Sequence, residues 1–436
     1  MQTFVGAEQG CLRIQNLSPD RATNVRASGL DQHGRHPFRD GSVFLAPGLD
    51  SNTINCGWHS VEAVKGDVSY AMVLRADVAI GTLLSTHWAE MEASTYLGPT
   101  YPGDRVIVPI FAEYRLALPH AALGRSAARL SSVVHVQNTD PDEAVRARIR
   151  IRDAQGQLVS DSTVEIPAGN SVTLDQREGS PLTALPSRMV GTFEASADKE
   201  LAVSSHVDVA GWYRAVLAFE GVPAQLASTT RFLPLLGYGR QSSRIAVLNP
   251  GGREARVSLR HSANRDASGQ ACVAGDLDRR AGTVVVPPGG LAFIPGDDSG
   301  STEPVGNCLA SAILRSDVPV LAAVVMTLDS PQADTADPET LGYIAPDLDD
   351  TGSRIALPKL RYGAYGMSAI QIMNPGAEPA DLVLELLPEF GDEPLACDAC
   401  SIRLAAGASQ LLYLGNFTDL PRGAYRGALQ SSAPLL

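Results

Sequence analysis

The sequence predicts an all-β protein, an array of about four tandem antiparallel β-sandwich domains whose first and last members are incomplete. The first observation is a repeated phrase. Residues 233–249 hold an apolar, proline-containing segment, a short polar hairpin and an alternating segment that ends at Asn-Pro-Gly. The phrase returns before Asn374, more loosely before Asn138, and in clipped form before Asn16. A phrase that recurs at domain-sized spacing indicates a tandem repeat.

The second observation is the spacing of the asparagines that end the phrase. Asn16, Asn138, Asn249 and Asn374 are separated by 122, 111 and 125 residues, intervals too long for a solenoid turn and typical of a small domain. The third is the placing of 40 Gly and 29 Pro between short alternating segments with little helix signal, which is typical of β-sandwiches. We expect domains at residues 1–103, 104–228, 229–350 and 351–436.

The first block reads as a series of short strands. Period-two alternation puts Leu12 and Ile14 on one face of a strand and Arg13 and Gln15 on the other. The block lacks the full Leu-Pro strand of the later blocks, and Thr3–Val5 is the segment that can replace it. Strands are expected at Leu12–Asn16, Asn24–Leu30, Ser42–Ala46, Asn52–Asn55, Ser69–Arg75 and Val78–Thr86.

The second block contains the best helix candidate and the most regular strand. Pro119 and Gly124 weaken a helix at Ala117–Leu130, so we expect an excursion between strands there. The segment Ala144–Arg152 alternates strictly, with four arginines on one side. These arginines form either a basic, anion-binding strip or, as we favour, the solvated face of an antiparallel strand beside carboxylates.

An acidic segment, Ala333–Ser353, separates the third and fourth blocks and reads as a boundary or a long surface loop. Its carboxylates make Asp347, Asp349 and Asp350 candidate Ca²⁺ ligands, although their spacing does not follow an EF-hand and a solvated acidic loop is the alternative. The fourth block ends inside the segment that matches Leu309–Val320. Either the chain is part of a longer array, or neighbouring copies complete its open edges by strand addition.

The six cysteines fall in pairs inside blocks, which favours local disulfides and an oxidising compartment over buried free thiols. Cys397 and Cys400 form a C-x-x-C between strand-like segments. A redox thiolate needs a helix N-terminus, so a small loop disulfide is the preferred interpretation. The predicted disulfide cysteines are Cys11, Cys56, Cys272, Cys308, Cys397 and Cys400.

Composition excludes some classes of partner. Apolar residues make up 44% of the 436 residues, as in a folded protein. The net charge of −13 argues against nucleic acid, whose binding depends on Lys and Arg. The sequence contains no run of about 18 apolar residues that could span a membrane. Its first ten residues do not have the pattern of a signal peptide.

Few segments suggest chemistry. Residues 296–301, Gly-Asp-Asp-Ser-Gly-Ser, resemble the surroundings of a serine-protease nucleophile, but such an enzyme also needs a placed His and Asp. Ser196 and Lys199 fit S-x-x-K, yet they fall at a polar strand break shared by all blocks. We therefore predict that the protein is not an enzyme and has no catalytic residue and no cofactor-binding residue.

Histidine and tryptophan offer weak binding hypotheses. His33 and His36 could hold a metal only with further ligands, and His135 and His206 lie in alternating strands, where a structural role is expected. Trp58, Trp88 and Trp212 could stack on sugars, but they occupy different places in their blocks, so packing is favoured. Apart from the calcium candidates, we predict no metal and no cofactor.

The recurring pattern resembles the tandem Ig-like β-sandwich repeats of secreted bacterial cell-surface proteins. The resemblance rests on Leu233-Pro234, the alternating strand Ile370–Asn374, the turn Ala406–Ser409 and Ser316-Asp317. These are turn and packing motifs. The resemblance therefore implies an architecture and exposure on a cell surface, and it implies no active site.

The expected function is that of a non-enzymatic extracellular structural protein, a stalk, coat or filament subunit of a bacterial surface. Its expected partners are copies of itself, joined through open strand edges as a homo-polymer, or other cell-surface components. The alternative is an adhesin or an array of carbohydrate-binding modules.

Overall fold

The computed structural model describes residues 2–4, 9–16, 18, 20–31, 41–47, 51–54, 70–78, 80–88, 91–97, 102–117, 127–176, 180–210, 215–238, 241–263, 277–278, 281–294, 308–328, 339–363, 366–389, 393–395, 397, 400–417 and 420–436. Strands dominate these residues, and every strand pairing among them is antiparallel. The predicted all-β fold with several antiparallel sheets is confirmed. The Ig-like class of the repeats stays a prediction.

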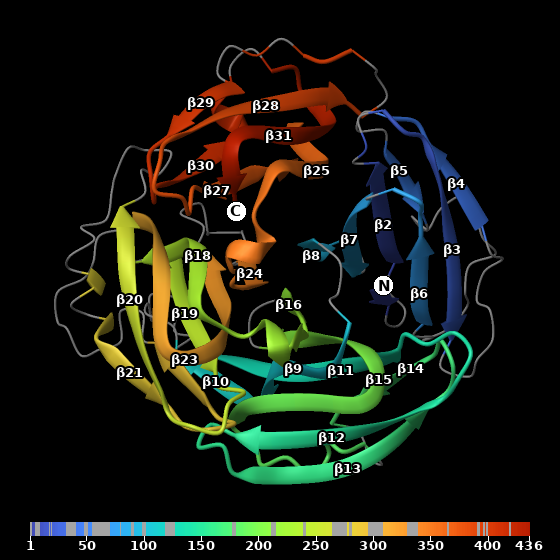
Figure 1. Cartoon of the computed structure of the whole chain (residues 1–436), viewed down its shortest axis with the longest axis vertical. Coiled ribbons are helices and arrows are strands. Elements are labelled where there is room, and N and C mark those ends of the chain that lie inside the picture. Colours follow the sequence, from blue (N-terminus) through green and yellow to red (C-terminus); the bar gives the residue numbers. More distant parts are fainter. Residues whose placement is uncertain are drawn as a thin grey trace.

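Hydrogen-bonded strands belong to four consecutive groups, which we call modules 1 to 4 (Figure 1). Module 1 contains two sheets, ordered β1-β6-β3-β4 and β5-β2-β7-β8. Its strands are β1 (Gln2–Phe4), β2 (Gln9–Asn16), β3 (Thr23–Asp31), β4 (Gly41–Leu45), β5 (Ser51–Ile54), β6 (Tyr70–Arg75), β7 (Ile80–Trp88) and β8 (Met91–Leu97). The short β1 pairs with β6, as expected of a replacement for the missing Leu-Pro strand, whereas β8 was not predicted.

Modules 2 and 3 are each organised by one long strand whose two halves pair with different neighbours. Module 2 comprises β9 (Gly103–Ala112), β10 (Tyr114–Ala117), β11 (Ala127–Asn138), β12 (Val145–Asp153), β13 (Leu158–Ile166), β14 (Ser171–Leu174), β15 (Met189–Ala210), β16 (Ala215–Glu220) and β17 (Val222–Pro223). Module 3 comprises β18 (Ser228–Tyr238), β19 (Gln241–Leu248), β20 (Ala255–Ala263), β21 (Thr283–Val286), β22 (Leu291–Ile294), β23 (Cys308–Leu328) and β24 (Glu339–Ile344), after the 3₁₀ turn η2 (Ala224–Leu226).

Module 4 follows the 3₁₀ turn η3 (Leu348–Asp350). It comprises β25 (Gly352–Gly363), β26 (Gly366–Met367), β27 (Ala369–Met373), β28 (Ala380–Pro388), β29 (Ser401–Leu404), β30 (Ser409–Tyr413), the turn η5 (Leu414–Asn416) and β31 (Gly423–Leu435). A three-strand core of β25, β31 and β28 carries β29 at its edge, and β27 pairs with β30.

The polar break in each long strand lies where its pairing partners change. In β15, Met189–Ser196 pairs with β9, whereas Leu201–Ala210 pairs with β11, and the register shifts between Ser196 and Leu201. In β23 the half before Ser316 pairs with β18 and β20, and Leu321–Leu328 pairs with β19. At these breaks polar residues such as Asp198 and Asp317 are exposed.

The strongest alternating segment forms a strand as predicted. In β12, Val145, Ala147, Ile149 and Ile151 are buried in the sandwich core, and the intervening arginines point outward. The described ends of the segment Ala117–Leu130 form strands, because β10 and β11 pair with Tyr114 opposite Leu130, so the disfavoured helix does not form at these ends. Turn residues and non-local pairing outweigh a short local helix signal.

The four modules follow one another around a ring (Figure 1). Module 4 lies beside module 1, with β25 next to β2 and β7, and the side-chain amide of Gln15 donates to Gly427 O at 3.3 Å. The predicted array is therefore closed. One core cluster also continues from Phe111 of module 2 to Leu248 and Val325 of module 3. Independent folding of the four domains stays a prediction.

Candidate functional site

The four repeated asparagines occupy equivalent buried positions in the four modules. Each is at most 1% exposed. In module 3 the Nδ2 of Asn249 donates to Arg253 O at 2.7 Å and to Val286 O at 3.1 Å, and its Oδ1 accepts the N–H of Gly251 at 3.0 Å. The equivalent bonds occur at Asn16, Asn138 and Asn374. A bond from the asparagine Oδ1 to the backbone N–H two residues on is thus present in every module.

The joints between modules repeat as well. Thr192 Oγ1 donates to Gly289 O of module 3 at 2.8 Å, and Ser409 Oγ of module 4 donates to Ser311 Oγ of module 3 at 2.7 Å. In the joint that closes the ring, Gln15 meets Gly427. Thr192, Ser311 and Gly427 all lie in the first half of the long strand of their modules, so the outer face of that sheet carries the neighbour.

The joint between modules 2 and 3 also contains aromatic stacking and close backbone packing. The rings of Tyr114 and Phe293 stack with centroids 5.6 Å apart. A Cβ on Gly156 would lie 2.0 Å from Pro288 O, so the β12–β13 turn fits against module 3 only with glycine there. Gly156 also has a φ of +78°, which favours glycine for a second reason.

The equivalent face of module 2, at its joint with module 1, is polar. The register places Thr173, His135, Ser204 and Glu220 in one row across β14, β11, β15 and β16. His135 Nδ1 lies 3.0 Å from Thr173 Oγ1, and its ring meets that of His206 edge-on with centroids 5.2 Å apart. His135 is 1% exposed. The row therefore places titratable groups inside a joint.

Burial controls the charge of this row. Burial, and then the neighbouring imidazole of His206, hold the pKa of His135 well below its ordinary value. Burial lowers the pKa of His206 to about 4 and raises the pKa of Glu220 to about 8. Within the described residues, His135 Nε2 and Ser204 Oγ are buried without a hydrogen-bond partner. The row is therefore a buried polar joint whose titratable groups have shifted pKa values.

A buried arginine joins the linkers on both sides of module 3. Arg231 is 2% exposed and donates to Leu226 O before module 3, and to Val320 O and Ala345 O within it. Its Nη1 lies 3.4 Å from the carboxylate of Asp347 after β24. Every donor of a buried guanidinium needs such a partner.

The calcium candidates lie at this linker. Asp347 Oδ1 accepts the N–H of Asp349, and Asp350 Oδ2 accepts the N–H of Asp347, so the two carboxylates cap the turn η3. Among the described residues there is no group of three or more His, Cys, Asp or Glu that could hold a metal. The carboxylates of Asp347 and Asp350 cap the turn, and that of Asp347 also pairs with Arg231. Calcium binding stays a prediction.

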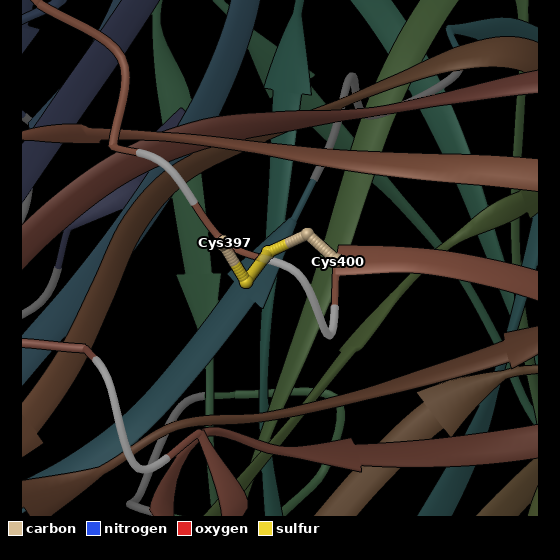
Figure 2. The surroundings of a disulfide bond; sticks show 2 residues. All are labelled: Cys397 and Cys400. Carbon is tan, nitrogen blue, oxygen red and sulfur yellow. A yellow bond between two sulfur atoms is a disulfide. The ribbon is translucent and has the colours of Figure 1, made fainter.

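The cysteines divide by what the structure describes. Cys397 and Cys400 form a disulfide just before β29 (Figure 2), and Cys400 is 3% exposed. Cys308, the first residue of β23, is also disulfide-bonded. Cys11 lies in β2, and Cys56 and Cys272 lie outside the described residues.

The remaining sequence candidates have structural surroundings or fall outside the description. Lys199 Nζ bridges Asp140 Oδ2 at 2.6 Å and Glu143 Oε2 at 2.5 Å, so the S-x-x-K segment forms an ion-paired corner. This pairing lowers the pKa of Asp140 to about 2. Trp88 lies in β7. Residues 296–301, His33, His36, Trp58 and Trp212 lie outside the described residues.

The arginine strip of β12 faces carboxylates. Arg148 and Asp161 approach to 2.5 Å, and Arg150 Nη1 lies 3.2 Å from Glu194 Oε1, which belongs to a carboxylate that also binds Arg105 at 2.7 Å. Charges that satisfy one another in this way leave little net field for an anion. The favoured interpretation, a solvated face beside carboxylates, agrees with these contacts.

The outer rim of the ring presents one edge strand from each module: β4, β13, β21 and β29 each end the strand order of a sheet. Two of these edges carry charge, with Asp161 and Glu165 in β13 and Arg403 in β29. The other two, β4 and β21, have the sequences GSVFL and TVVV, and expose Phe44 by 61% and Val285 by 47%. The sequence alone could not identify these four strands as rim edges, because only the order of strands in each sheet places them there.

Comparisons with known proteins give little. No protein-family model matches the chain, and no curated protein sequence matches it. A solved structure described as "Biofilm associated protein - BSP domain" aligns over 98% of this chain and 88% of its own, at 8% identity and a TM-score of 0.16. That likeness is too weak to support an inference. No helix in the described part of the chain is long and apolar enough to cross a bilayer.

Proposed function

We propose that this chain is a non-enzymatic extracellular structural protein, a coat or filament subunit of a bacterial surface, that joins copies of itself through strand edges on its rim. The observation that carries this proposal is the closed ring of four modules, which turns an open β edge outward in each. Open edges present unpaired N–H and C=O groups to another chain. The disulfide Cys397–Cys400 supports an oxidising compartment.

Closure bears on the choice among the three structural roles. A stalk gains length when modules follow one another in a line, whereas here β2 of module 1 lies against β25 of module 4. The four modules therefore form a closed unit instead of an extended one. Such a unit suits a coat or a filament, in which reach comes from adding copies.

Electron microscopy of the native material, together with light scattering of the purified chain across a concentration series, tests this proposal. We expect mass to rise with concentration, and rings in contact at their rims in the images. A chain that stays monomeric at its solubility limit would refute the proposed self-association.

A further inference from the structure

Two of the four rim edges are built differently from the other two. The exposed side chains of β4 include Ser42 and Phe44, and those of β21 include Thr283 and Val285. Neither strand contains a charged residue. Natural proteins protect edge strands with charges, and modules 2 and 4 follow that rule with β13 and β29. The edges of modules 1 and 3 lack this protection in a chain of net charge −13.

Position in the ring matters as much as composition. Modules 1 and 3 lie opposite each other, so β4 and β21 face away from each other on opposite sides of the molecule (Figure 1). When β4 of one copy contacts β21 of a second copy, β21 of the first copy and β4 of the second stay free. Contacts of this unlike kind, repeated without closure, build an open line of subunits.

We propose that β4 of one copy pairs with β21 of another as neighbouring strands of one continuous sheet, so that the occupant of each edge is a second copy of this chain. The inference rests on the proposed function and names the surface that would perform it. Phe44 and Val285 then face each other across the new pair, and an aromatic side chain beside a β-branched one is a favourable cross-strand pair.

The size of the edges sets the strength of the contact. β4 has five residues and β21 has four, so the pair forms only a few main-chain hydrogen bonds over a small area. Interfaces of that size are weak and transient in solution. Assembly should therefore follow concentration, as it would where many copies are held at one surface.

Phe44→Lys and Val285→Lys test the proposal by light scattering and electron microscopy of the full chain. Each places a charge on one edge at an exposed position and leaves the core intact. Val383→Lys is the matched control, because Val383 is also 47% exposed but lies in β28, which is paired on both sides. We expect each edge variant alone to lose filaments and to associate at least about tenfold more weakly, whereas the control assembles like the wild type.

Mixing the two edge variants identifies the partner of each edge. Phe44→Lys keeps an intact β21 and Val285→Lys keeps an intact β4, so an equimolar mixture should form dimers that grow no further. Edge variants that assemble normally while the wild type also assembles would overturn this proposal and leave the proposed function standing. Dimers of one variant alone would overturn the unlike pairing. A wild-type chain that never associates would overturn both.

Discussion

Removing the side-chain amide of Asn249 tests whether the repeated asparagine holds each module together. Asn249→Ala deletes three hydrogen bonds, to Arg253 O, Val286 O and the N–H of Gly251. Asn249 is 1% exposed, so water cannot replace the lost bonds. A net contribution of about 1 kcal/mol for each bond gives a destabilisation of about 3 kcal/mol.

A second variant at the same position separates hydrogen bonding from side-chain volume. Asn249→Asp keeps the shape of the side chain and the acceptor for Gly251, but it turns a carboxylate oxygen toward two carbonyl oxygens. Burying an unpaired charge beside like partial charges costs more than leaving a small space. The aspartate variant should therefore be less stable than the alanine variant, although it is closer in size.

Hydrogen exchange read by mass spectrometry is the appropriate assay, because a four-module chain need not unfold in one step. Protection of the peptides around Asn249 and Val286 should fall by the factor that corresponds to about 3 kcal/mol, roughly a hundredfold or more. Asn416→Ala is the control, since Asn416 is exposed and should change stability by less than about 0.5 kcal/mol. A cost below about 1 kcal/mol at Asn249 would refute the reasoning.

Three further changes test other parts of the ring. Arg231→Met removes the partner of the largely buried Asp347 and should cost about 3–5 kcal/mol in chemical denaturation. The pKa of His206 is about 4 in the folded chain, below its unfolded value near 6.5. Because the folded chain therefore binds fewer protons than the unfolded chain, the contribution of His206 to stability is fully present above pH 6.5. It falls by up to about 3 kcal/mol as the pH falls toward 4. The dependence of the thermal unfolding temperature on pH across that range should be weaker in His206→Gln. Replacing Cys397 and Cys400 by serine should cost about 2 kcal/mol or less, because the closed loop is short, as exchange in that loop would report.

The sequence predicts the asparagine turn because half of its chemistry is local. The bond from Asn249 Oδ1 to the N–H two residues on depends on neighbours in the chain. The bond from its Nδ2 to Val286 O spans 37 residues and depends on the fold. The type of turn could thus be predicted, whereas its role in fixing a second strand could not.

Closure of the ring carries no local signal. Gln15 and Gly427 are 412 residues apart, and Gln15 occupies the face of its strand that alternation assigns to solvent. It is 0% exposed. The equivalent residues of modules 3 and 4, Leu248 and Met373, are apolar and also buried. A strand that is apolar on both faces indicates burial on both faces. Leu248 and Met373 are therefore the residues from which the joints could have been predicted.

Closure also bears on the proposed assembly, because it leaves the rim as the surface where copies would meet. Each joint buries the outer face of a sheet that would otherwise be open to another chain, at Gln15, Leu248 and Met373 alike. The edge strands β4, β13, β21 and β29 stay outward, and charge guards two of them. Two uncharged edges on opposite sides of the ring would give the proposed assembly a direction of growth, because each added copy would present the next edge along the same line. The joints fix the shape of one chain, and in the proposed assembly the distribution of charge among the edges decides how copies meet.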